Sequence, residues 1–231
     1  MHIKIWSDIR CPFCYIGKKH FEAALEQFPH NDKVTVEWKS FELDPNLKTD
    51  TDTDAISHFV ESKGIEKERA IMMFDNVTAM AEKAGIAFHL EQAIPANSLK
   101  AHRLLHFAKK QELAYQTKAA LLQAHLCDGL NIDDVEVLAS IAMEQGMDKQ
   151  EVIDMLTTEA YIYDVRQDEM EARNLGISGV PFFVIDNTYG VSGAQPVAVF
   201  KESLEKAWEK HQENVEVITK DASCDLDGRC C

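Results

Sequence analysis

Strand-forming sequence is confined to the two ends of this chain, and that division constrains its fold more than any other feature. His2 to Trp6 alternates apolar and polar residues, and Val34 to Leu43 is rich in β-branched and aromatic residues with a period of two. Between them, apolar residues recur at helical spacing from Cys14 to Phe28. The first 50 residues therefore predict a strand, a helix and a second strand.

The C-terminal part repeats strand signals after a long interval. Pro181 to Ile185 predicts a buried strand, and Asp186 and Asn187 predict a turn into a second strand at 189–192. Gln195 to Lys210 has helical periodicity, and the residues after Asn214 are compatible with the start of a further strand. These segments predict a hairpin followed by a helix.

The interval from about residue 54 to residue 173 contains almost no strand signal and predicts about six helices. The whole pattern is typical of the α/β class, a thioredoxin-like fold with an inserted all-helical domain. We expect residues 1–50 and 176–214 to form the thioredoxin-like domain, residues 51–175 the helical insertion, and residues 215–231 a cysteine-containing tail. Met72, Met73 and Met80 are expected in the core of the insertion, with a methionine-rich cleft surface as the alternative.

Composition excludes several classes of function. The formal net charge of −15 argues against a nucleic-acid partner, because phosphate recognition needs clustered Lys and Arg. No apolar run approaches the roughly 20 residues of a membrane span, and the first residues turn polar too early for a signal peptide. We therefore expect a cytoplasmic protein, in which thiols are kept reduced.

Two cysteines, Cys11 and Cys14, flank Pro12 and Phe13 at the start of the first predicted helix. A zinc site needs about four ligands, so one such pair does not predict a metal site. The amides at a helix N-terminus stabilise a thiolate, which can lower a cysteine pKa from about 8.5 to roughly 3.5–7.5. The pattern predicts a redox dithiol, with Cys11 as the exposed nucleophile and Cys14 as the buried resolving thiol.

Two further residues bear on this dithiol. Pro181 begins a strand, either as an ordinary trans proline or as a cis proline that faces the cysteines and leaves the backbone of Val180 free to pair with a substrate. Asp8 either ends the first strand, which we favour, or accepts the proton of the buried thiol.

The chain resembles the DsbA-like thioredoxin-fold oxidoreductases, and within them the FrnE-like subgroup. Four segments carry the resemblance over nearly the whole chain: SDIRCPFCYIGK at 7–18, WKSFELDP at 38–45, AHRLLHFA at 101–108, and GISGVPFFVI with YGVSGAQP within 176–196. The resemblance implies thiol–disulfide exchange through a mixed disulfide, without a bound cofactor. It assigns Cys11 as nucleophile, Cys14 as resolving thiol and Pro181 as cis-proline.

The same resemblance implies disulfide-containing proteins or glutathione as partners, contacted by Pro12, Phe13, Val180 and Pro181. Phe13 stands where periplasmic DsbA has histidine, which favours reductase or isomerase duty over strong oxidation. Two alternatives stay open. One is a glutathione-binding enzyme like the kappa-class transferases and hydroxychromene-carboxylate isomerases, and the other is a non-enzymatic adaptor.

The remaining cysteines and histidines carry weaker predictions. Cys224 and Cys230 form a candidate second redox pair, with a metal site that includes Cys231 and an inert tail as alternatives. Cys127 is expected to be a buried single thiol, and His102, His106 and His125 are expected to serve packing or lie on the surface. The sequence does not distinguish a monomer from a homodimer.

Overall fold

A four-stranded mixed sheet joins the two ends of the chain. The computed structural model describes the backbone of residues 1–221 and the side chains of residues 1–212. The strands are β1 (His2–Ser7), β2 (Thr35–Ser40), β3 (Phe182–Ile185) and β4 (Tyr189–Ser192), in the order β2-β1-β3-β4. β1 pairs in parallel with β2 and antiparallel with β3, and β3 pairs antiparallel with β4. The predicted thioredoxin-like class is confirmed.

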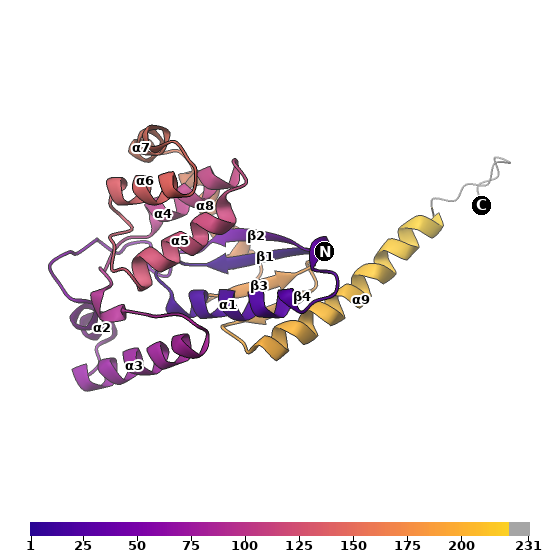
Figure 1. Ribbon diagram of the computed structural model, residues 1–231, viewed down its shortest axis with the longest axis horizontal. Coiled ribbons are helices and arrows are strands. Elements are labelled where there is room, and N and C mark those ends of the chain that lie inside the picture. The colour runs from indigo at the N-terminus through magenta and orange to yellow at the C-terminus, as the bar shows by residue number, and fades with distance from the viewer. Residues whose placement is uncertain (222–231) are drawn as a thin grey trace.

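Two helices cover one face of this sheet, α1 (Pro12–Glu26) and α9 (Val197–Asp221) (Figure 1). The alternation in β1 explains the packing: Ile3 and Ile5 point toward these helices and join a core that contains Phe21, Phe183 and Phe200. The ring centroids of Phe183 and Phe200 lie 4.6 Å apart in an edge-to-face arrangement.

The opposite face is covered by α8 (Ile162–Asn174), the last helix before β3. Trp6 of β1 points to this face, opposite to Ile3 and Ile5. It packs against Ala172 and donates a hydrogen bond from Nε1 to the carbonyl of Asp168 at 2.9 Å. α8 is thus the outer layer of the sheet, although it belongs to the helical run in the sequence.

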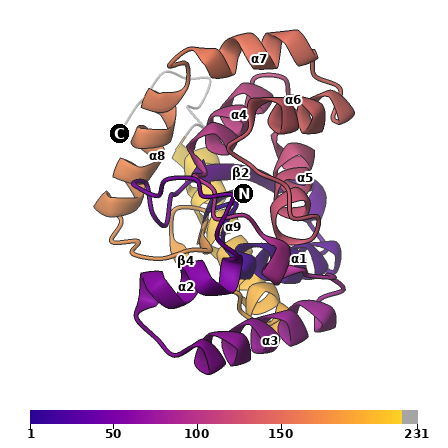
Figure 2. The same ribbon diagram turned by 90° about the vertical axis from the view of Figure 1, so that its left-hand side faces the viewer.

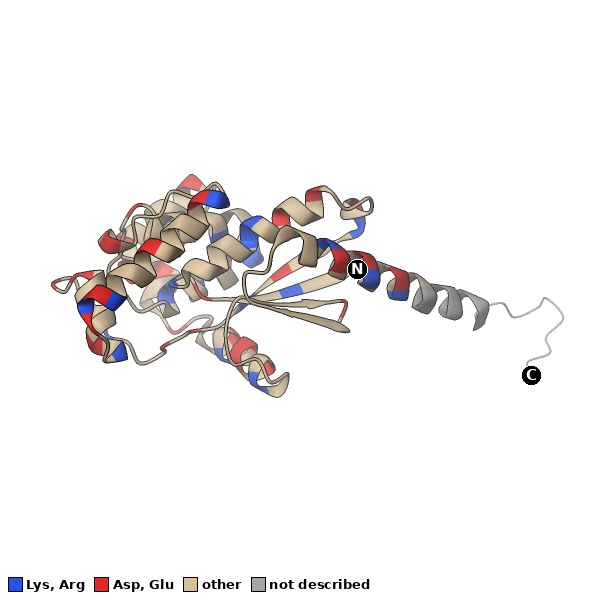
Figure 3. Ribbon diagram, turned by 90° about the horizontal axis from the view of Figure 1, so that it is seen from below, with Lys and Arg blue, Asp and Glu red and all other residues tan. Residues whose placement is uncertain are grey.

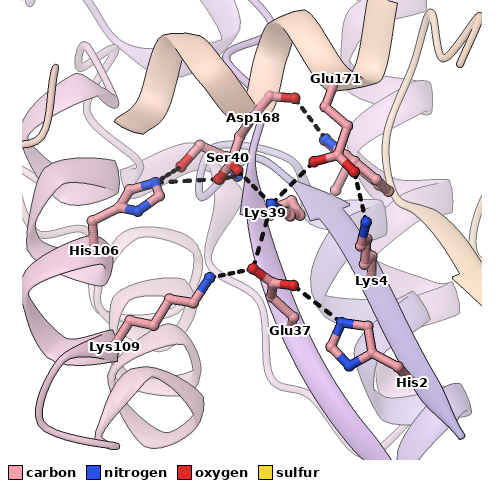
Figure 4. A network of polar contacts seen from close by, with 10 residues as sticks. His2, Lys4, Glu37, Lys39, Ser40, His106, Lys109, Asp168 and Glu171 are labelled. Carbon is pink, nitrogen blue, oxygen red and sulfur yellow. Dashed lines mark hydrogen bonds and ion pairs between the residues drawn. The ribbon is translucent and has the colours of Figure 1, made fainter. Parts of the chain in front are cut away.

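A network of charged side chains fastens α8 and α4 to the sheet (Figure 4). Lys39 Nζ of β2 lies 2.9 Å from Asp168 Oδ1 and 3.1 Å from Glu171 Oε2. Asp168 Oδ2 also lies 3.2 Å from His106 Nε2. Because these groups are mostly withdrawn from solvent, their attraction is screened less than that of surface pairs.

Seven helices lie between residues 51 and 175, against the six or so expected. They are α2 (Ala55–Lys63), α3 (Lys67–Lys83), α4 (Leu99–Lys109), α5 (Ala114–Leu126), α6 (Val135–Glu144), α7 (Lys149–Thr157) and α8, with short 3₁₀ turns at Leu90–Gln92 and, outside this block, Asn31–Lys33. Helices α4 to α7 share a core of their own, whereas α2 buries none of its residues and α3 buries only Ala70 and Ala81.

Several local predictions are corrected. Met72, Met73 and Met80 are exposed on α3 instead of filling a core, because α3 packs through only a narrow face. Residues 215–221 continue α9 as helix and form no strand. β2 ends at Ser40, before the predicted Leu43, whose backbone N–H donates to the Asp8 carboxylate at 2.8 Å.

Acidic and basic side chains are interspersed along the helices, including the first part of α9 (Figure 3). Among the residues that the structure describes, every helix is too short or too polar to cross a membrane.

Candidate active site

The Cys-Pro-Phe-Cys motif lies at the N-terminus of α1, which runs between the α2–α3 pair and the other inserted helices (Figure 2). Cys11 is the N-cap residue with extended backbone angles, and Pro12 occupies the first turn, where its missing N–H costs nothing. Cys14 follows one turn later, and its N–H donates to the carbonyl of Cys11 at 3.0 Å. Both cysteines are free thiols.

The expected exposure of Cys11 is wrong. Cys11 is 4% exposed and Cys14 is 1% exposed, because the inserted helices cover this end of α1. Cys11 nevertheless lines a cavity of about 470 Å³, whereas Cys14 does not. Access therefore makes Cys11 the sulfur that an incoming molecule can reach.

A cis peptide bond joins Val180 to Pro181 beside the cysteines. The thiol of Cys11 donates to the carbonyl oxygen of Val180 at 3.6 Å, so the loop before β3 lies against the motif. Gly17 permits this approach, since a Cβ at this position would lie 2.9 Å from Pro181 Cγ. The structure thus brings the loop of Val180 and Pro181 to the two cysteines, and Pro181 is the cis proline that the resemblance implies.

The two thiols interact and titrate as one unit. Burial opposes ionisation, but the hydrogen bond between the sulfurs and the positive charge of Lys118 lower the pKa at which the pair loses its first proton. The same hydrogen bond, reinforced by burial, raises the pKa for loss of the second proton. The arrangement favours a dithiol with one negative charge.

Lys118, a buried cation that acts on the cysteine pair, was not among the residues that the sequence predicted for this site. It lies on α5, is 1% exposed, and its Nζ donates to the carbonyl of Ser7 at 3.3 Å. Burial lowers its pKa from 10.5 to about 8, while the charges of Cys14 and Asp8 oppose that shift. A signal existed, because Lys118 shares helical spacing with the buried Leu121, Leu122 and His125.

Asp8 directly follows β1 and anchors the loop before Cys11, in agreement with the favoured interpretation. Its carboxylate accepts hydrogen bonds from the backbone N–H groups of Arg10 and Leu43, and His102 Nε2 lies 3.4 Å away. Burial alone would raise the pKa of Asp8, but these partners hold it well below its usual range. Asp8 stays ionised at neutral pH and is therefore a poor acceptor for a thiol proton.

The cavity beside Cys11 is walled by α1, α2, α3 and the end of α5. Of the residues predicted to contact substrate, Pro12 and Phe13 line it, and Phe13 is 38% exposed. Val180 and Pro181 lie outside this lining; the carbonyl of Val180 contacts Cys11, and Pro181 lies beside Gly17 of α1. Met73, on α3, also faces the cavity, as the cleft alternative for the methionines supposed.

The other sequence candidates take separate places. Cys127 is buried as predicted, and burial raises its pKa to about 11, which leaves it a poor nucleophile. Within residues 1–212, His102 and His106 approach different carboxylates instead of one common point. Cys224, Cys230 and Cys231 lie outside the described residues.

Comparisons with known proteins agree with this geometry. The family model for the DSBA-like thioredoxin domain matches residues 2–205. A probable DsbA oxidoreductase from Streptomyces coelicolor has a similar structure, with a TM-score of 0.86, 41% identity and 90% of each chain covered. The uncharacterized protein YwbO of Bacillus subtilis is 29% identical over 88% of this chain and 96% of its own. The cytosolic disulfide reductase DsbM of Pseudomonas aeruginosa shares the fold, with a TM-score of 0.63, 14% identity, and 94% of this chain and 100% of that chain covered.

Proposed function

The chain belongs to the family of DSBA-like thioredoxin domains. We propose that it is an oxidoreductase that catalyses thiol–disulfide exchange through Cys11 and Cys14. The observation that carries the proposal is a pair of interacting thiols of which only Cys11 opens into a cavity, with a buried cation nearby. Such a pair can both attack a disulfide and resolve the product.

In the proposed cycle, the Cys11 thiolate attacks one sulfur of a substrate disulfide. The substrate S–S bond breaks, a mixed disulfide forms on Cys11, and the departing thiolate takes up a proton. Cys14 then attacks the Cys11 sulfur, which releases the second substrate thiol and closes a Cys11–Cys14 disulfide. The substrate gains two electrons and the protein loses two, which a cellular thiol must later restore.

The residues around the pair support each step. The Lys118 ammonium favours the negative charge on the pair, so a thiolate exists at lower pH than in a free cysteine. We further propose that exchange runs mainly as reduction or isomerisation in the cytosol, where cellular thiols keep the pair reduced. The FrnE-like subgroup remains a prediction.

Trapping the mixed disulfide tests the proposal. The Cys14→Ala variant, treated with hydroxyethyl disulfide, is expected to carry one adduct on Cys11, seen by mass spectrometry of its peptides. In the peptide that contains residues 11–14, the Cys11→Ala variant should carry no adduct, and Cys127→Ala, which removes another buried thiol, should form the Cys11–Cys14 disulfide without an adduct. Absence of the Cys11 adduct in Cys14→Ala would refute the exchange mechanism.

The two alternatives predict different results. The kappa-class and isomerase-like enzymes use a serine near the first motif position, whereas this chain has Cys11 there and retains Cys14. A non-enzymatic adaptor would keep its cellular function when Cys11 is replaced by serine. Loss of that function in Cys11→Ser, with the fold preserved, would favour exchange.

A further inference from the structure

Cys11 lines the cavity between α1, α2, α3 and the end of α5, and the size of this cavity limits what can reach the sulfur through it. At about 470 Å³ it falls within the roughly 300–1,000 Å³ typical of small-molecule sites. Cys11 is buried at its wall, so a disulfide fixed on the surface of a folded protein cannot easily approach. A small molecule can place its sulfur against Cys11 without unfolding.

Two polar groups in this lining lack a partner. Nδ1 of His125 and Nη1 of Arg10 are buried, and neither forms a hydrogen bond within the described residues. The whole His125 side chain is nearly buried, with the residue 4% exposed. Leaving such groups unpaired costs about 1–3 kcal/mol each, so a bound molecule whose oxygen reached either nitrogen would recover part of that cost.

The charges of the lining identify the kind of oxygen. Arg10 and Lys63 are cationic, and Asp44 is the one carboxylate among the described lining residues. Burial, together with the charge of Arg10, lowers the pKa of His125 to about 4, so its imidazole is neutral at pH 7 and offers a hydrogen bond instead of a charge. A locally positive cavity in a chain with net charge −15 favours an anion such as a carboxylate.

The remaining walls are apolar. Phe59 of α2, Met73, Phe74 and Val77 of α3, and Leu126 of α5 face the same space. A ligand that satisfies the cavity therefore combines a carboxylate with an apolar body.

We propose that the preferred substrate is a small disulfide with a carboxylate on an apolar body, held by Arg10 and His125 while its sulfur meets Cys11. This inference rests on the proposed exchange function and names its substrate class. The reaction is the exchange already described: the protein dithiol is oxidised to a disulfide, and the small disulfide is reduced to two thiols.

Single-turnover oxidation tests the inference without an added reductant. The reduced protein is mixed with dithiodibutyrate or with its dimethyl ester, quenched with acid, and scored for the Cys11–Cys14 disulfide by mass spectrometry. The ester lacks the negative charges but retains the chain and the disulfide. For each compound, the rate constant measured with the protein is divided by the rate constant for the reaction of the same compound with reduced dithiothreitol. This normalisation removes the difference in intrinsic reactivity between the acid and the ester.

We expect a normalised acid-to-ester ratio of at least ten for the wild type. The ratio should fall about tenfold in Arg10→Gln and less steeply in Lys63→Gln, whose side chain is exposed at the rim. Arg69→Gln is the matched control, since it removes an exposed positive charge of α3 that does not line the cavity, and its ratio should equal that of the wild type. Insulin, a folded protein disulfide, should react at least tenfold more slowly than dithiodibutyrate.

Different failures have different meanings. If the wild type is oxidised by neither compound nor by insulin, the proposed function fails. If acid and ester react with equal normalised rates, or if insulin reacts as fast as dithiodibutyrate, the exchange function stands and the substrate inference is overturned. If Arg10→Gln lacks the wild-type circular dichroism spectrum, the test rests on the acid-to-ester ratio of the wild type and on Lys63→Gln. An unchanged ratio in Lys63→Gln would then overturn the inference that positive charge in the cavity selects a carboxylate.

Discussion

Replacement of Lys118 by methionine should stabilise the protein at neutral pH. Methionine has a similar length and no charge, so it fills the same buried space. The fall of the Lys118 pKa from 10.5 to about 8 means that the native state holds the ammonium at a net cost of about 3 kcal/mol, after the attraction of Cys14 and Asp8 is included. Lys118→Met removes this cost, with part of the gain offset by imperfect packing.

The pH dependence follows from linkage. Since the native pKa lies below the unfolded pKa, the native state binds fewer protons between about pH 8 and 10.5, and the free energy of unfolding of the wild type rises with pH across that window. The cost is fully present below about pH 8 and is gone above about pH 10.5. The stability advantage of Lys118→Met should therefore be greatest at pH 7 and shrink toward zero by pH 10.5.

Urea unfolding of the reduced proteins at several pH values measures this advantage. Lys206→Met, on the exposed surface of α9, is the control, and it should show no stability gain at pH 7 that disappears by pH 10.5. A second measurement is the pH profile of Cys11 alkylation by iodoacetamide. Loss of the cation should raise the pKa of the first thiol proton, so the alkylation profile should move to higher pH. A pH-independent stability difference, or a less stable variant at pH 7, would refute the reasoning.

Two further substitutions test the packing and charge around the motif. Gly17→Ala should lower the free energy of unfolding by about 1–3 kcal/mol, because the new Cβ would overlap Pro181, whereas Gly179→Ala, with open space around its Cβ position, should be close to neutral in the same urea titration. Asp8→Asn should have a lower free energy of unfolding than the wild type above about pH 4. That deficit should shrink as the pH falls, because the wild-type carboxylate becomes protonated and loses its advantage over the amide. A deficit that stays constant down to about pH 2 would contradict the assigned charge of Asp8.

The sheet and the dithiol could be predicted because local sequence determines both. The period of two in β1 sends Ile3 and Ile5 to one face and Trp6 to the other, whichever partners cover them. Cys11 and Cys14 gain their position from a helix that begins at Pro12, which also depends on neighbouring residues alone.

The burial of Cys11 and the role of Lys118 could not be predicted in the same way. Both depend on where the inserted helices pack against the sheet domain, and that placement joins residues more than a hundred positions apart, as in the contact of Lys118 with Ser7. The prediction of a strand after Asn214 was wrong for another reason. A β-branched run is compatible with a strand or a helix, and here it continues α9.

The position of α5 links the acidity of the thiols to ligand recognition. Lys118 and His125 are seven residues apart, so they lie on the same face of this helix about two turns from each other. Lys118 acts on the charge of the cysteine pair, and His125 lines the cavity into which Cys11 opens. Because one rigid helix carries both side chains, the inserted domain supplies a cation and a binding group that α1 lacks. Any substitution that shifts α5 should therefore change thiol ionisation and substrate selectivity together, whereas Arg10→Gln should change selectivity with a much smaller effect on ionisation.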